Sequence, residues 1–170
     1  MSTTMEKTTV WTVMDSPVGD LRIQASAGAI TRIEFSPFPA SLPLGQPLGE
    51  RDDDDPLLRR AAEQLRAYFA GDLKDFDLPL APQGTVFQQQ VWEQLRLIGY
   101  GETTSYGVIA ARLGKSSTAS RAVGLANGRN PIAIVIPCHR VIGANGTLIG
   151  YAGGLERKQA LLGLEQDALF

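Results

Sequence analysis

Three short stretches near the start of the chain predict strands: residues 9–15 are mostly β-branched and aromatic, and apolar and polar residues alternate in residues 21–25 and 30–35. These stretches are rich in β-branched and aromatic residues, which favour strands, and a period of two places their apolar side chains on one face. Turn-forming residues lie between them, at residues 16–20 and at an Ala-Gly pair. The pattern therefore predicts a meander of three antiparallel strands with one buried face.

A loop and a helix follow these strands. Residues 36–56 contain five of the ten prolines and four adjacent aspartates, which predicts a loop. Because the aspartates lack both spaced ligands and a glycine turn, we interpret them as a solvated run rather than a metal site. The last of them, Asp55, is placed to cap a helix that starts with Pro56, and apolar residues recur at helical spacing until Gly71.

Helical patterns dominate the second half of the chain. Thr85 and Gln88 form a capping-box pattern at the start of a helix that stops at Gly99. Two short helices are predicted next, at residues 105–113 and about 117–126, and the Gly-Lys-Ser turn between them gives a helix-turn-helix outline. This outline alone is weak evidence, because many corners of helical bundles share it.

Shorter elements and a last helix complete the prediction. The apolar run at residues 132–136 predicts a buried strand, the Asn-Gly pair within residues 143–146 predicts a hairpin turn, and residues 155–164 predict a helix that ends near Glu165. The fold class is therefore α+β. We expect a small N-terminal domain with an antiparallel sheet over residues 1–83, and a mostly helical C-terminal domain with a helix-turn-helix over residues 84–170.

The composition is that of a soluble globular protein, since 44% of the 170 residues are hydrophobic and 20% are charged. No apolar run approaches the ~20 residues that a membrane span needs, and the first ten residues show no apolar core of a secretory signal. The single cysteine cannot form an internal disulfide, and a free thiol persists best in a reducing compartment. We therefore expect a cytoplasmic protein with no membrane partner.

Charge is distributed unevenly along the chain. The net charge of −2, taken alone, argues against a nucleic-acid partner. However, residues 84–170 carry eight Lys or Arg and five Asp or Glu, and residues 103–140 contain five cations and no acid. A local basic face of this size is suited to modest phosphate binding, because charges act over a Debye length of ~10 Å, but an ordinary solvated face would have the same composition. The charge pattern leaves both interpretations open.

The only cysteine and the only histidine of the chain are neighbours, Cys138 and His139. A thiol is a ready nucleophile and imidazole titrates near neutrality, although a buried cysteine beside a chance histidine is the ordinary alternative for such a pair. Adjacent residues on a strand point to opposite faces, so the two side chains can cooperate only on a turn or at a helical start. Pro137, directly before the cysteine, favours such a turn.

The motifs around this pair resemble those of one protein family. IPCHRV at residues 136–141, RAVG at 121–124, Asn130-Pro131 and GYAGG at 150–154 are spaced as in the O6-alkylguanine-DNA alkyltransferases, also called methylated-DNA–protein-cysteine methyltransferases. The resemblance is dense over about residues 84–165 and looser before them. It implies a ribonuclease H-like N-terminal domain and a repair protein that takes alkyl groups from O6 of guanine, and less so from O4 of thymine, in double-stranded DNA.

The resemblance also implies catalytic roles. Cys138 would accept the alkyl group irreversibly, so that each molecule acts once, and His139 would take the thiol proton through a bound water. Glu165 would orient the imidazole, as in a catalytic triad. Asn130 would brace the turn that carries the cysteine. Tyr106 would press on the phosphate of the target nucleotide and donate a proton to the leaving guanine.

DNA contacts follow from the same resemblance. The target nucleotide must leave the stacked duplex to reach a buried thiol, and Arg121 would occupy the gap that it leaves. The flipped base would stack beside Tyr151 and be read by backbone groups of Cys138, Val141 and Ala152. The expected DNA-binding set comprises Tyr106, Ala119, Ser120, Arg121, Ala122, Gly124 and Arg129.

Two departures from the family pattern affect these expectations. Some members have serine where this chain has Ala152, but a backbone contact there should be preserved. Some members also hold a structural zinc, which one cysteine and one histidine cannot build, so we expect no metal and no other cofactor. The protein is expected to be monomeric in solution, and whether it assembles cooperatively on DNA is left open.

Two other functions are alternatives to alkyl transfer. An alkyltransferase-like protein would bind the lesion without accepting the alkyl group, and the presence of Cys138 argues against it. A Cys-His hydrolase would not explain the basic helix pair.

Overall fold

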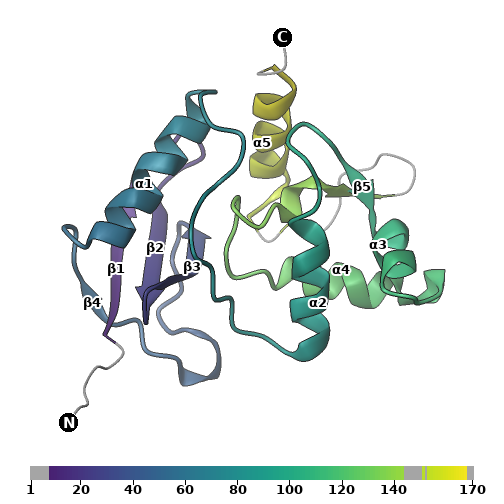
Figure 1. Cartoon of the computed structure of the whole chain (residues 1–170), viewed down its shortest axis with the longest axis horizontal. Helices are drawn as coiled ribbons and strands as arrows, with labels where there is room; N and C mark the ends of the chain where they lie inside the picture. Colours follow the sequence, from purple (N-terminus) through teal and green to yellow (C-terminus); the bar gives the residue numbers. More distant parts are fainter. Residues whose placement is uncertain (1–7, 144–150, 152, 168–170) are drawn as a thin grey trace. The chain divides into compact units, whose positions relative to one another are not determined.

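The chain folds into two units, Met1–Pro82 and Gln83–Phe170, in the computed structural model (Figure 1), which describes residues 8–143, 151 and 153–167. The N-terminal unit contains a four-stranded sheet, and the C-terminal unit is mostly helical. Among the described residues, no helix is long and apolar enough to cross a membrane.

The predicted meander of three strands is confirmed. Strands β1 (Thr9–Met14), β2 (Leu21–Ser26) and β3 (Ala29–Phe35) pair antiparallel in sequence order. A fourth strand, β4 (Glu50–Arg51), pairs parallel with β1, so the sheet order is β3-β2-β1-β4. This strand lies in the stretch predicted to be a loop. Its two exposed residues are too few to show an alternating pattern.

The expectation of one buried face is wrong for β2, where five consecutive residues are buried. On the face expected to be polar, Arg22 pairs with Glu34 at 2.7 Å, and its guanidinium lies 4.9 Å from the ring centroid of Phe38. The Gln24 amide donates hydrogen bonds to the carbonyls of Pro47 and Leu48. The loop after β3 therefore covers this face, where its backbone carbonyls bind Gln24 and the ring of Phe38 packs on Arg22.

Helix α1 (Pro56–Phe69) begins and ends as predicted. A carboxylate oxygen of Asp55 accepts a hydrogen bond from the Leu58 amide at 3.0 Å, which caps the helix. Gly71, with φ of 81°, follows its C-terminus. The apolar stripe of the helix is buried at Leu58, Ala61, Ala62, Leu65 and Tyr68.

The C-terminal unit begins with the predicted capping box, in which Thr85 and Gln88 bond each other's backbone amides at 2.9 and 3.1 Å. The helix that follows, α2 (Val86–Leu95), is shorter than predicted, because it ends at Leu95 and the chain continues in turns to Gly99. The indole of Trp92 on α2 donates a hydrogen bond to the carbonyl of Ala126 at 2.9 Å. The other elements of the C-terminal unit are β5 (Thr104–Ser105), α3 (Tyr106–Arg112), η3 (Ser117–Ala119), α4 (Ser120–Gly128), η4 (Cys138–Arg140), β6 (Val141–Ile142) and α5 (Leu155–Asp167).

The helix-turn-helix outline is present as α3, the 3-10 turn η3 and α4. The buried strand predicted at residues 132–136 is wrong, because this segment forms turns with a single bridge residue. Four of its five apolar side chains are buried, all but that of Val135, and hydrogen bonds from Asn130 replace the partner strand. The hairpin turn predicted at residues 143–146 falls mostly outside the described residues.

Candidate active site

Cys138 opens the 3-10 turn η4 (Cys138–Arg140), directly after Pro137. A 3-10 turn has three residues per turn, so adjacent side chains point about 120° apart, and Cys138 and His139 do not face opposite directions as they would on a strand. Cys138 is a free cysteine with 6% of its surface exposed, and His139 is fully buried. A reactant can therefore meet this sulfur only if it enters the protein.

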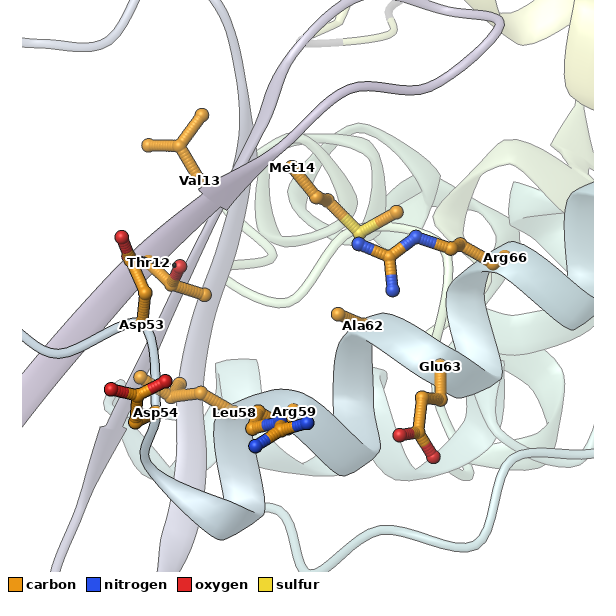
Figure 2. A pocket seen from close by; sticks show the side chains of 10 residues that line it. All are labelled: Thr12, Val13, Met14, Asp53, Asp54, Leu58, Arg59, Ala62, Glu63 and Arg66. Carbon is orange, nitrogen blue, oxygen red and sulfur yellow. Dashed lines mark hydrogen bonds between the residues drawn. The ribbon is translucent and has the colours of Figure 1, made fainter.

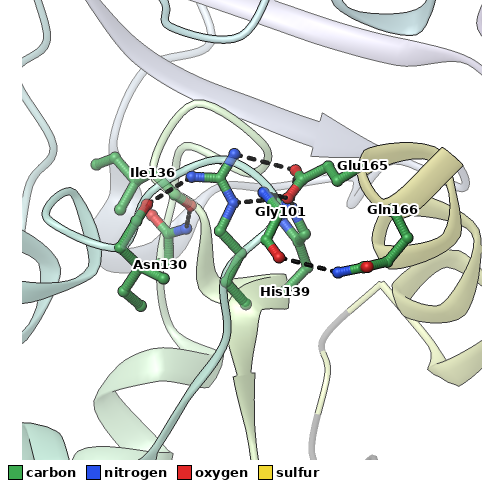
Figure 3. Close-up of polar contacts among 8 residues, drawn as sticks. Gly101, Asn130, Ile136, His139, Glu165 and Gln166 are labelled. Atoms are coloured by element: carbon green, nitrogen blue, oxygen red, sulfur yellow. Dashed lines mark hydrogen bonds and ion pairs between the residues drawn. The ribbon is translucent and has the colours of Figure 1, made fainter. Parts of the chain in front are cut away.

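Asn130 braces the approach to this turn (Figure 3). Its side-chain amide donates hydrogen bonds to the carbonyls of Ile136 at 2.8 Å and Ile132 at 3.2 Å, and its side-chain oxygen accepts the Ile132 amide at 3.0 Å. A second amide, Asn127 at the end of α4, donates to the carbonyl of Cys138 at 3.4 Å. The cysteine backbone is thus tied to the last turn of α4 and to the residues just after it.

The braced segment contains a strained residue. Ile134 has φ of 72°, in the left-handed region that a β-branched side chain rarely adopts, and it is buried. Such a conformation costs about 1–3 kcal/mol and persists only where the surroundings enforce it. Here the hydrogen bonds of Asn130 on both sides of Ile134 supply that restraint.

His139 and Glu165 form a buried pair. Nε2 of His139 lies 2.7 Å from a carboxylate oxygen of Glu165, and the second carboxylate oxygen accepts the Gly101 amide at 3.2 Å. Because Nε2 carries the hydrogen that faces the carboxylate, Nδ1 of the neutral ring is an acceptor. Nδ1 is buried and has no hydrogen-bond partner among the described residues. The imidazole therefore has one nitrogen oriented by Glu165 and the other ready to take a proton.

Burial lowers the pKa of His139, and the positive charges of Arg140 and Lys158 act in the same direction. The Glu165 carboxylate opposes them, both as a hydrogen-bond acceptor and by its charge. The net effect keeps the imidazole neutral, which is the form that a proton acceptor needs.

Arg140 is a member of this site that the sequence did not reveal. Its guanidinium contacts both carboxylate oxygens of Glu165, at 2.9 and 3.0 Å, and donates to the carbonyl of Ile98 at 2.7 Å. In the sequence, Arg140 is one of the five cations of residues 103–140 that suggest a basic face, but its side chain is buried. Glu165 thus divides its charge between an arginine and the imidazole.

The thiol of Cys138 is held in its neutral form at rest. Burial raises its pKa, while hydrogen bonds from Asn130 and Tyr151 and the charge of Lys158 lower it by smaller amounts. A buried thiol is a poor nucleophile until it loses its proton. A proton acceptor close to the sulfur is therefore part of any reaction at this site.

Tyr106 belongs to the same neighbourhood. It is the first residue of α3, after the capping residue Ser105, and burial together with the charge of Cys138 raises its pKa. Its ring packs on Gly124 of α4, where an added Cβ would lie 3.8 Å from two ring carbons. A tyrosine that keeps its proton can donate it to a reactant.

The other predicted site residues divide into two groups. Val141 is buried directly after η4, where its amide donates to the Cys138 carbonyl, and Tyr151 lies close enough to Cys138 to lower the pKa of the thiol. Ala152 falls outside the described residues. The structure does not bring the predicted DNA contacts on and around α4 into the buried cluster: Ala119, Ser120 and Gly124 are half-buried, and Arg121, Ala122 and Arg129 are exposed.

A hollow of about 460 Å³ in the N-terminal unit contains none of these residues (Figure 2). It lies between β1, α1 and the aspartate run, with Arg59 and Arg66 facing the same space as Asp53 and Glu63. In the described part of the chain, no group of three or more potential ligands could hold a metal ion.

Two family models match the chain and together span most of its length. Residues 9–82 match the ribonuclease-like domain of 6-O-methylguanine DNA methyltransferase, and residues 86–167 match the DNA binding domain of the same protein.

Similar proteins agree with these matches. The methylated-DNA–protein-cysteine methyltransferase of Methanosarcina acetivorans is 48% identical over 155 residues, which cover 91% of this chain and 97% of the relative. The protein of that name from Mycobacterium tuberculosis strain H37Rv is also 48% identical, over 91% of this chain and 90% of its own. Among solved structures, Mycobacterium tuberculosis OGT in complex with DNA has a TM-score of 0.84 at 47% identity, with 94% of each chain covered.

Proposed function

The chain belongs to the 6-O-methylguanine DNA methyltransferase family, and on that premise we propose that it repairs DNA by moving the methyl group of O6-methylguanine to Cys138. One observation carries the proposal. The only thiol of the chain is buried beside an imidazole whose Nε2 is held by Glu165 and whose Nδ1 has no hydrogen-bond partner among the described residues.

DNA binding is assigned to the helix-turn-helix of the C-terminal unit. Four cations in and around α3 and α4 are exposed and free to approach phosphates: Arg112, Lys115, Arg121 and Arg129. Half-buried Ala119, Ser120 and Gly124 are small, so Arg121 is the single long side chain at the start of α4, which allows close approach to a duplex backbone. A relative crystallised with DNA supports this assignment.

Nucleotide flipping follows from the burial of the thiol. O6 of guanine lies within the stacked and paired duplex, and a cysteine with 6% exposure cannot reach it there. Arg121 is exposed at the start of α4 and would occupy the space left by the extruded nucleotide, while Tyr106 positions the phosphate beside it. The extrusion costs a few kcal/mol, and less for a lesion that already pairs badly.

Methyl transfer then proceeds as a displacement at carbon. The thiol proton passes through a water to Nδ1 of His139, whose charge Glu165 stabilises. A sulfur electron pair of Cys138 forms the new S–C bond, and the O6–C bond breaks with its electrons passing to the guanine. Tyr106 donates a proton to the leaving base, which restores guanine, and the proton that His139 took from the thiol then returns to Tyr106 through solvent.

The product explains why each molecule acts once. The thiolate of a neutral thioether is a poor leaving group, and the chain has no second cysteine to take the methyl group from Cys138. The protein is therefore consumed in proportion to the lesions that it repairs.

The restoration of guanine tests this function. A duplex with a single O6-methylguanine is incubated with the parent protein or with Cys138→Ser, and its nucleosides are then quantified after digestion. We expect the parent to convert O6-methylguanine to guanine and the variant to leave it unchanged. Conversion by Cys138→Ser at the parent rate would mean that the thiol is not the acceptor.

A further inference from the structure

Helix α5 turns one buried face toward η4, the turn that carries Cys138. Lys158, Leu161 and Glu165 lie on this face, and each residue is 0% exposed. Glu165 contacts His139 within η4, whereas Nζ of Lys158 donates a hydrogen bond to the carbonyl of Val141, the residue that ends η4. The helix therefore brings an anion to the imidazole and a cation to the end of the cysteine turn.

A fully buried lysine is uncommon because an ammonium loses its hydration when it leaves water. Burial accordingly lowers the pKa of Lys158, while the negative charge of an ionised Cys138 raises it. In return, the charge of Lys158 lowers the pKa of Cys138. This attraction exists only when the sulfur is a thiolate, because a neutral thiol has no net charge to attract the ammonium.

We propose that Lys158 supplies the positive charge that stabilises the Cys138 thiolate during methyl transfer, an inference that rests on the transfer reaction proposed above. The charge acts at one step. When the thiol proton moves to His139, the sulfur becomes negative, and the ammonium of Lys158 stabilises that charge until the S–C bond forms. The electron pair then lies in the new bond, and the thioether is neutral.

The other charged groups around this step are accounted for. Glu165 pairs with Arg140 and also with the ring of His139, so its negative charge offsets that of Arg140 and of the imidazolium that forms when His139 takes the proton. Tyr106 keeps its proton because its pKa is raised. After transfer, Lys158 is left beside a neutral thioether, so its own proton should become easier to remove.

Lys158→Met tests the first half of the proposal, because methionine keeps most of the volume and removes the charge. The rate of Cys138 alkylation by iodoacetamide is measured against pH, and the single cysteine makes the readout specific. We expect the midpoint of the profile to rise by about one pH unit or more, as removal of a close opposite charge predicts. Lys158→Arg should stay closer to the parent, and exposed Lys74→Met should coincide with it. A Lys158→Met profile equal to that of the parent would overturn the proposal.

A second measurement needs no variant at Lys158 and so does not depend on how a substitution folds. Iodomethane converts Cys138 of the parent protein to the S-methyl form, and the four lysines are then titrated by carbon-13 NMR before and after methylation. Lys158 should lose its proton at a lower pH in the methylated protein, while the other lysines are unchanged. Identical titrations would contradict the proposal.

Neither measurement uses DNA, so the two proposals fail separately. If the parent protein takes no methyl group from O6-methylguanine DNA, the proposed function is wrong, whatever the thiol profile. If transfer occurs but the pH profile of Cys138 alkylation is the same in Lys158→Met as in the parent, only the proposed role of Lys158 is wrong.

Discussion

Glu165 binds two groups at once, the imidazole of His139 and the guanidinium of Arg140, and all three side chains are buried. Glu165→Gln preserves the shape of the side chain but leaves Arg140 as a buried charge without its counter-ion. Breaking a buried pair from one side costs about 3–5 kcal/mol, so we expect a loss of that size in urea unfolding. Glu156→Gln, on the exposed face of the same helix, should change stability by less than about 0.5 kcal/mol. Equal stability of the two variants would show that Glu165 is not needed to balance Arg140.

The single histidine allows a direct test of the imidazole. Its pKa is lowered from 6.5, chiefly by burial. Between the lowered value and 6.5, the unfolded chain binds a proton that the folded chain does not, so stability falls as pH decreases through this window. Proton NMR of the His139 ring should show no titration until the pH is well below 6.5. A ring that titrates at 6.5 or above would contradict the neutral, proton-accepting form.

At the scale of single residues, the sequence predicted the Cys138–His139 pair but missed two buried cations near it. Cys138 and His139 were evident because each is the only residue of its type. Arg140 and Lys158 were missed because arginine and lysine are almost always exposed, and a sequence counts them as surface charge. The position of Lys158, seven residues before Glu165 and so on the same helical face, was the only available signal.

Among the elements, α4 carries Arg121, which we propose distinguishes duplex repair from simple thiol reactivity. Arg121→Ala should reduce repair of O6-methylguanine in duplex DNA at least tenfold, because flipping costs a few kcal/mol and the gap is no longer filled. Its reaction with the free base O6-benzylguanine should match that of the parent, since a free base needs no flipping. Arg59→Ala, an exposed arginine of α1, serves as the matched control and should behave as the parent on both substrates. Equal losses on duplex and free base for Arg121→Ala would refute its role in flipping.

Helices and strands were predicted correctly where local sequence signals were strong, and wrongly where tertiary contacts determine the backbone conformation. The caps at Asp55 and Thr85 marked helix starts correctly because capping depends on neighbouring residues alone. The apolar run at residues 132–136 indicated a strand, but burial alone does not choose between a strand and a turn. The side chain of Asn130 decides here, and its hydrogen bonds could not be read from the apolar pattern.

At the scale of the whole molecule, the exposed cations set the strength of DNA binding. Four of the five cations in residues 103–140 are exposed, and Arg140 is buried in the site. Each phosphate contact contributes about −0.9 to the slope of log affinity against log salt, so the slope should be no steeper than about −4. Fluorescence anisotropy with an undamaged duplex measures it. A slope near zero would show that these cations make no phosphate contacts. A much steeper slope would require a larger basic surface than these residues provide.

The central claim is that Cys138 itself receives the methyl group, once per molecule. The parent protein is incubated with an excess of duplex containing O6-methylguanine, and its intact mass and its peptides are then determined by mass spectrometry. We expect every reactive molecule to gain a single methyl group in place of the thiol hydrogen, on the peptide that contains Cys138. An unmodified protein recovered from a reaction that has restored guanine, or a methyl group on another residue, would contradict the account.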